Sequence, residues 1–252
     1  MLKNITALLS LLILVAACKK KDPDPQPADS YLKITVQPTY SNLGQQNIQL
    51  DTVYTTSEGY KVKFTDIKFY LTKLKNGSVN LLESAYFDYR ETGLLLAKVK
   101  GDYMQFPNLQ GYIGVDSLLN HSDPSEFPND SPLNISNAGS MHWGWNTGYI
   151  FINLEGKVDT IPNDGIANFD HNFSFHIGTD SYRRDFDFTN INWQTASANE
   201  KVFSLKLDLW TFLHNPSNPI DLKTQFLTHT GSGQQALTEK VTTNFKQSLI
   251  SY

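Results

Sequence analysis

The sequence predicts a mainly β fold: an antiparallel β-sandwich with one amphipathic helix at the C-terminus. Three observations lead to this prediction. Apolar and polar residues alternate along many short segments, turn-forming residues separate these segments, and apolar residues recur every four positions near the end of the chain. Alternation with a period of two is typical of half-buried strands. Many such strands with few helical stretches favour a sandwich or barrel.

The segment at residues 60–74 changes its alternation part-way along. Val62 and Phe64 share one face, whereas the apolar residues from Ile67 onward have the opposite parity. The change predicts either two strands or one strand with a β-bulge. Asn76-Gly77 then predicts a tight hairpin turn. Further strands are predicted at Tyr31–Val36, Val79–Leu82, Tyr112–Val115, Gly148–Leu154, Asn172–Ile177, Arg184–Phe188 and Val202–Leu209.

Near the C-terminus the apolar residues take helical spacing. Leu237, Val241, Phe245 and Leu249 step by four, and charged or polar residues occupy the other positions. This pattern predicts an amphipathic helix from about Ala236 to Ile250, with its apolar stripe packed across one end of the sheets.

The first 30 residues indicate export and lipid anchoring. The apolar run from Ile5 to Ala17 is shorter than the roughly 20 residues of a membrane span, which is typical of a signal peptide. It ends in Val15-Ala16-Ala17-Cys18, which resembles a bacterial lipobox, whose cysteine carries fatty acids such as palmitate. We therefore expect a signal peptide at residues 1–17, an acylated Cys18 and flexible tether at 18–30, and an outer-membrane lipoprotein.

The composition of the remaining chain, residues 31–252, indicates one domain, because it contains no second linker and no repeat. The formal net charge is −4 and no lysine or arginine cluster lies beyond the tether, which argues against nucleic acid as a partner. Cys18 is the only cysteine, so this domain forms no internal disulfide. No nucleophile motif, phosphate loop or zinc-protease motif occurs, so we do not expect an enzyme.

Several short motifs follow one another in the order of a known family. They are Asp66–Tyr70 (DIKFY), Gly101–Tyr103, Gly114–Asp116, Asn120–Asp123 (NHSD), Pro132–Asn134 (PLN), Met141–Tyr149 (MHWGWNTGY) and His176–Gly178. This order resembles the MbnP-type copper-binding family of periplasmic or lipid-anchored proteins. The resemblance spans about residues 31–250.

The resemblance implies copper as the ligand, as Cu(I). The matching site residues are His121, His176 and Trp143 or Trp145, and Met141 and His142 are further candidates in this chain. Imidazole nitrogen and thioether sulfur both suit copper. In some relatives a tryptophan is oxidised to kynurenine by a di-haem peroxidase-like partner, so such a partner is implied here as well.

Copper binding requires the imidazoles of His121 and His176 to converge. Two nitrogens bound about 2 Å from one metal lie at most about 4–5 Å apart, so we expect both rings at that distance, facing Trp143 or Trp145. Two alternatives remain open. The tryptophans could form a core layer, or they could be an exposed platform of a metal-free module that binds a sugar or peptide. His171, five residues before His176, should face the other side of its strand.

The lipobox leads to the first testable prediction. The substitution Cys18→Ser should stop lipidation and release or stall the protein, because the acylated thiol is lost. The measurement is fatty-acid labelling together with membrane fractionation. A Cys18→Ser protein that still carries the label and partitions fully with membranes would refute the lipobox interpretation.

Overall fold

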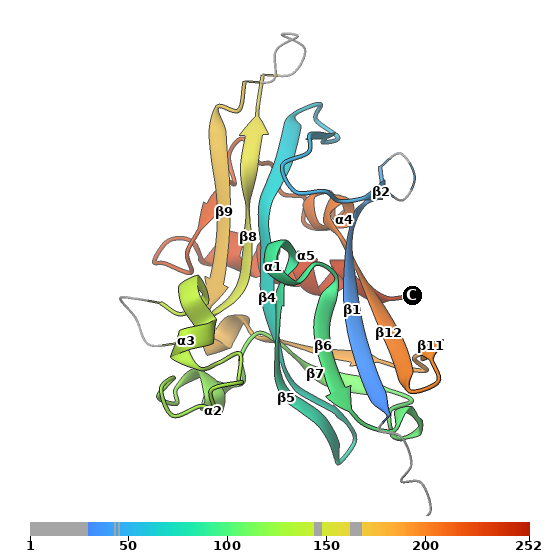
Figure 1. The fold of residues 1–252 in the computed structure, drawn as a ribbon. Helices are drawn as coiled ribbons and strands as arrows, with labels where there is room; N and C mark the ends of the chain where they lie inside the picture. The colour runs from blue at the N-terminus through green and yellow to red at the C-terminus, as the bar shows by residue number, and fades with distance from the viewer. Residues whose placement is uncertain (1–29, 43, 45, 144–147, 162–167) are drawn as a thin grey trace, which may run out of the picture.

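Two curled β-sheets face each other across one hydrophobic core (Figure 1). The computed structural model describes residues 30–42, 44, 46–143, 148–161 and 168–252. The six-stranded sheet contains β1 (Tyr31–Tyr40), β2 (Gln46–Asn47), β6 (Leu95–Lys100), β11 (Gln194–Ser197), β12 (Glu200–Asp208) and β14 (Leu249–Ser251). The eight-stranded sheet contains β3 (Tyr54–Thr55), β4 (Lys61–Asn76), β5 (Val79–Asp88), β7 (Leu109–Ile113), β8 (Ile150–Asp159), β9 (His171–Gly178), β10 (Arg184–Phe188) and β13 (Leu227–Thr228).

Short helices occupy the connections between these strands. They are α1 (Tyr89–Thr92), α2 (Ser117–Asn120), α3 (Ile135–Ala138), α4 (Leu209–Leu213) and the 3-10 turns η1 (Tyr103–Gln105), η2 (Gly139–Met141) and η3 (Asp180–Tyr182). The long helix is α5 (Gln235–Ser248). No helix in the described part of the chain is both long enough and apolar enough to cross a membrane.

The predicted sandwich-like, mainly β fold is confirmed, but the sheets are mixed rather than purely antiparallel. β1 runs parallel to β12, and β13 runs parallel to β9. Side chains alternate in the same way in parallel and antiparallel strands, so alternation in the sequence does not reveal strand direction.

The change of parity predicted within residues 60–74 is a β-bulge in one long strand. β4 pairs with β8 along most of its length, and the register shifts between Phe64 and Asp66. Because of this shift, Phe64 and Ile67 are both fully buried in the core. The predicted hairpin is also confirmed, since Asn76 of β4 pairs with Val79 of β5. Gly77 has a φ of 57°, which a glycine adopts readily in such a turn.

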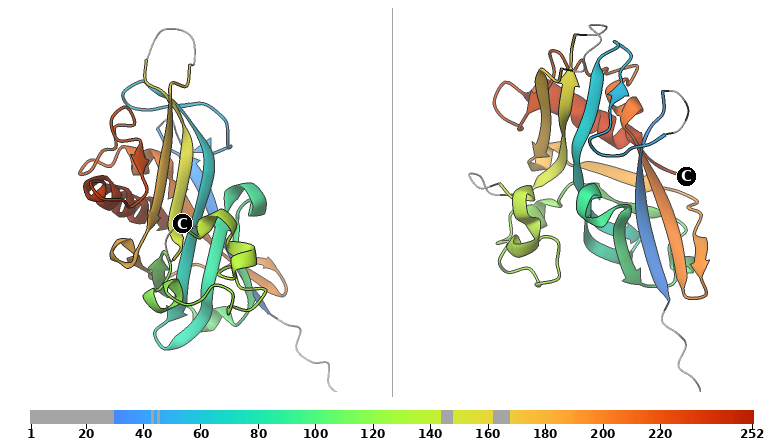
Figure 2. Two further views of the ribbon diagram at one scale, coloured as in Figure 1. Left: turned by 90° about the vertical axis from the view of Figure 1, so that its left-hand side faces the viewer. Right: turned by 45° about the horizontal axis from the view of Figure 1, so that its top comes forward.

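The C-terminal helix closes the sandwich at one side (Figure 2). α5 contacts β9 and β10 of one sheet and β12 of the other. Val241 and Phe245 on its apolar stripe are fully buried. The helix ends at Ser248, two residues earlier than predicted, because Leu249–Ser251 instead form β14 and pair with β12.

The packing of α5 leads to the second prediction. The ring of Phe245 lies edge-on to Phe69 of β4, with ring centroids 5.2 Å apart. Phe245→Ala should lower the free energy of unfolding by about 3–5 kcal/mol, because it leaves a cavity in a filled core. The matched control is Tyr252→Ala, since Tyr252 is exposed and its loss should change stability by less than about 0.5 kcal/mol. Equal urea midpoints for wild type and Phe245→Ala would contradict this role.

Candidate metal centre

One face of the eight-stranded sheet carries a polar row that crosses three neighbouring strands. Lys68 of β4 lies opposite Asn153 of β8, and Asn153 lies opposite His176 of β9. Their side chains share the face opposite to the core face, because the alternate residues of β9 are buried in the core, namely Phe173, Phe175 and Ile177. The strand register therefore holds the direction of the His176 side chain.

A carboxylate and a hydroxyl hold the imidazole of His176. Its Nε2 lies 2.6 Å from Oε1 of Glu155 and 3.1 Å from Oγ of Ser174. The hydrogen bond from His176 lowers the pKa of Glu155, although burial acts in the opposite direction. Glu155 is therefore an anion next to this ring, and a carboxylate of this kind orients the imidazole of a metal ligand in many metalloproteins.

A second imidazole, that of His229, stacks on His176. The two rings are nearly parallel, with centroids 4.7 Å apart and planes inclined by 9°. Nε2 of His229 lies 3.4 Å from the same Ser174 hydroxyl. Burial lowers the pKa of His229, and the neighbouring His176 lowers it further. Both effects favour the neutral ring, which is the form that binds a metal.

The loop after β13 holds His229 in this position. The side-chain oxygen of Gln234 accepts hydrogen bonds from the backbone N–H groups of His229 and Gly231, at 2.8 and 3.0 Å. The hydroxyl of Thr230 donates to the carbonyl oxygen of His176 at 3.1 Å, and it accepts from the N–H of Gly178 at 3.0 Å. These bonds attach the loop to the last residues of β9.

The indole of Trp143 lies against both imidazoles. Its ring centroid is 6.3 Å from that of His176 and 6.5 Å from that of His229, and only 6% of the residue is exposed. A Cβ atom at Gly178 would lie 2.7 Å from the indole nitrogen of Trp143. A glycine at this position is therefore needed for the close approach of the tryptophan to β9.

The histidine of the NHSD motif belongs to a different cluster. His121 follows α2, its side chain is 58% exposed, and its Nε2 lies 3.1 Å from Oδ2 of Asp180. Asp180 also accepts hydrogen bonds from the Ser117 hydroxyl and from Nδ2 of Asn120. Burial alone would raise the pKa of Asp180, but these three partners together lower it.

The predicted pairing of His121 with His176 therefore needs correction. His176 faces Trp143 as expected, but no ring contact joins His121 to His176 among the residues that the structure describes. The imidazole beside His176 belongs to His229, which lies in none of the motifs found in the sequence. The reason is that α2 directs His121 toward Asp180, whereas the parallel pairing of β13 with β9 brings residue 229 beside residue 176.

The other candidate residues have separate surroundings. Met141 is fully buried in the hydrophobic core, and the ring of His142 packs edge-on against Tyr149 with centroids 5.0 Å apart. Trp145 lies outside the described residues. His171 stacks on Phe226 and has the opposite parity to His176 on β9, in line with the prediction that the two rings face opposite sides.

Two observations bear on whether this cluster suits a metal ion. Within the described ranges, no three His, Cys, Asp or Glu side chains are grouped to hold a metal as they stand. However, the buried side-chain oxygen of Asn153 has no hydrogen-bond partner, and Asn153 lies directly opposite His176. A pocket of about 330 Å³ is lined in part by Glu155 and Ser174, the two residues whose side chains contact Nε2 of His176. The site thus offers two imidazoles, an unsatisfied oxygen and access from solvent.

Comparison with known proteins identifies the family. The family model described as MbnP matches residues 29–237. The chain belongs to the MbnP family. This family is associated with copper handling. Among solved structures, this MbnP-family chain is similar to "MbnP from Methylosinus trichosporium", at 13% identity and a TM-score of 0.45, over 83% of this chain and 93% of that one. No curated protein matches.

The Asp180 cluster leads to the third prediction. Because the folded-state pKa of Asp180 is lowered, its carboxylate contributes stability that is fully present above the ordinary pKa of about 3.9 and disappears as pH falls through the lower folded value. Asp180→Asn should therefore lower the urea midpoint near neutral pH, and the difference from wild type should shrink steadily as the pH is lowered below the ordinary pKa of an aspartate. Asp185→Asn, at a highly exposed aspartate, is the control. A difference that does not change with pH would contradict this assignment.

Proposed function

We propose that this protein binds Cu(I) outside the cytoplasm through His176 and His229, beside Trp143. The observation that carries the proposal is the stacked pair itself, with centroids 4.7 Å apart and an indole against both rings. Imidazole is a good ligand for copper. The lone pair of each ring nitrogen lies in the plane of its ring, and the two planes are inclined by only 9°, so the ring of His229 must turn for both histidines to reach one Cu(I) ion. Membership of the MbnP family supports copper as the metal.

The hydrogen bonds of the two rings suggest which nitrogen atoms bind the metal. Nε2 of both histidines contacts the Ser174 hydroxyl, and Nε2 of His176 also contacts Glu155. Nδ1 of His176 and of His229 has no hydrogen bond to any residue that the structure describes. We expect Nδ1 of each ring to bind the metal, while Glu155 orients His176 through its hydrogen bond to Nε2. The unsatisfied oxygen of Asn153 lies on the same face of the sheet.

We also propose that Trp143 is the tryptophan to be oxidised. Its indole lies against both histidines, so a kynurenine formed there would add an amine and a ketone to the imidazoles around the metal. The implied oxidant is a di-haem peroxidase-like partner. The proposal of lipid anchoring at Cys18 in the outer membrane rests on the Val15–Cys18 sequence alone, because these residues lie outside the described range.

The metal-free binding module has less support at this site. A sugar or peptide platform needs an exposed aromatic face, and Trp143 is almost completely buried.

The fourth prediction tests the ligand pair. His176→Ala and His229→Ala should each lower the affinity for Cu(I) by about tenfold or more, because each removes one of two donor nitrogens. The measurement is a competition titration against a Cu(I) chelator, with circular dichroism to show that each variant is folded. The matched control is His171→Ala, since His171 lies on the same strand and stacks on Phe226 instead.

The same titration separates the present assignment from the one predicted from sequence. His121→Ala should leave Cu(I) affinity near the wild-type value, because His121 is bound to Asp180. Wild-type affinity in both His176→Ala and His229→Ala would refute the proposed site. If His121→Ala lowers the affinity for Cu(I) as much as His176→Ala does, the pairing of His121 with His176 predicted from the sequence is correct instead.

A further inference from the structure

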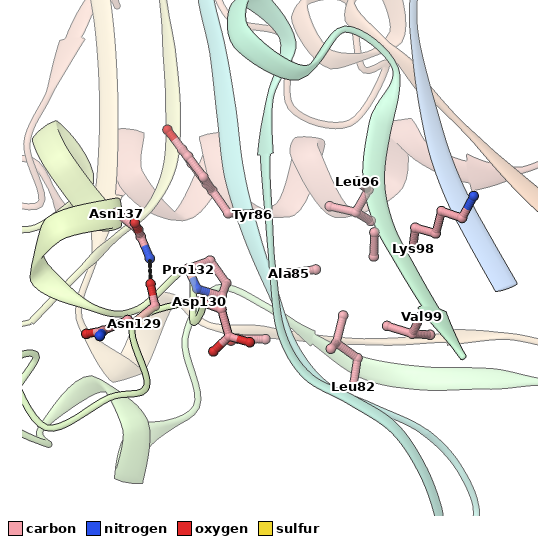
Figure 3. Close-up of a pocket in the computed structure, with 12 residues that line it drawn as sticks. Leu82, Ala85, Tyr86, Leu96, Lys98, Val99, Asn129, Asp130, Pro132 and Asn137 are labelled. Carbon is pink, nitrogen blue, oxygen red and sulfur yellow. Dashed lines mark hydrogen bonds between the residues drawn. The ribbon is translucent and has the colours of Figure 1, made fainter. Parts of the chain in front are cut away.

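A groove of about 480 Å³ lies between β5, β6 and the loop at residues 129–137 (Figure 3). β5 crosses its floor, β6 forms one wall, and the loop at residues 129–137 forms the other. Leu82, Leu96 and Val99 line its apolar part, and Asn129 and Asp130 line its polar end. None of these residues belongs to the histidine cluster described above.

The groove runs along strand edges rather than over one face of a sheet. Within the described residues, β5 pairs with β4 alone and β6 pairs with β1 alone, so each strand has one edge without a partner strand. Successive residues Ser84, Ala85 and Tyr86 of β5 line the groove, as do successive residues 96–99 of β6. Successive side chains of a strand point to opposite faces, so a pocket that touches all of them lies beside the backbone.

The side chains at the centre of the groove are small. Ser84 and Ala85 on β5 and Ala97 on β6 are buried and project little beyond the backbone. Small residues let another chain approach closely enough to pair with the free N–H and C=O groups of an edge strand.

The charge of the groove favours a basic occupant. Asp130 is exposed and forms no ion pair with any other described residue. Lys98 is the cation among the lining residues, but its ammonium pairs with Glu200 and lies over the ring of Tyr31, 5.1 Å from the ring centroid. The charge of Lys98 is thus neutralised within the protein, whereas that of Asp130 is available to a ligand.

We propose that this groove binds an extended segment of another polypeptide, added as a strand to the free edge of β5. The segment spans about five residues, because the groove follows β5 from Leu82 to Tyr86 and an extended chain advances about 3.3 Å per residue. A lysine or arginine of the segment faces Asp130. This peptide site is independent of copper binding, so either proposal can fail without the other.

The test uses the full chain and a defined probe, an acetylated and amidated five-residue peptide of alternating threonine and valine with lysine at its centre. Binding is followed by changes in the backbone amide resonances of residues 82–86 and 96–99. The expected result is saturable shifts confined to those strands. Replacing the central lysine by glutamate should weaken binding by about threefold, the change that an exposed ion pair gives.

Two matched comparisons test the mode of binding. In Asp130→Lys the preference between the two peptides should reverse, whereas Asp185→Lys, at an exposed aspartate outside the groove, should keep it. Two further peptides carry N-methyl groups, one at the odd-numbered residues and one at the even-numbered residues. One of these two peptides should no longer bind and the other should bind as before, because only one edge of the added strand faces β5. Equal binding of both methylated peptides would overturn the proposal, as would shifts elsewhere. If the resonances of these strands instead shift with protein concentration in the absence of peptide, the groove binds a second copy of this chain, and the peptide proposal is wrong.

Discussion

The register of β4 against β8 decides which side chains of this protein face the core and which face the histidine cluster. Side chains alternate along a strand, so a slip of one residue would exchange the two faces. The bulge between Phe64 and Asp66 lets both halves of β4 direct their apolar residues inward. The same register aligns Lys68 with Asn153 and, through β8, with His176. The hydrophobic core and the polar row are therefore two consequences of one strand alignment.

One histidine of the pair lies on a rigid strand, and the other lies on a loop. His176 projects from the interior of β9, and its direction is set by the sheet and by Glu155. His229 follows the two-residue strand β13, and its loop is held by a hydrogen bond that Gln234 accepts and one that Thr230 donates. A scaffold strand with a loop facing it is a common way to build a binding site, because the loop can adjust to a ligand while the strand keeps its geometry.

Much of this fold could be predicted because its signals are local. The parity change in β4, the Asn76-Gly77 turn and the four-residue spacing of α5 each depend on neighbouring residues. The parallel pairing of β1 with β12 could not be predicted, because the two strands are far apart in the sequence and alternation carries no direction. His176 and Trp143 were found through family motifs. His229 was missed because it lies in no motif and reaches His176 only through the short strand β13. The motif around His121 was visible in the sequence, but the turn that directs its ring toward Asp180 was not.

Copper binding by this protein depends, in our proposal, on His176 and His229 holding one Cu(I) ion together. The most direct measurement is X-ray absorption at the copper edge of the full chain loaded with an equimolar amount of Cu(I). We expect a first shell with imidazole nitrogens from two histidines in the wild-type protein, and from one in His229→Gln. A wild-type spectrum without imidazole scattering, or one that His229→Gln leaves unchanged, would contradict this proposal.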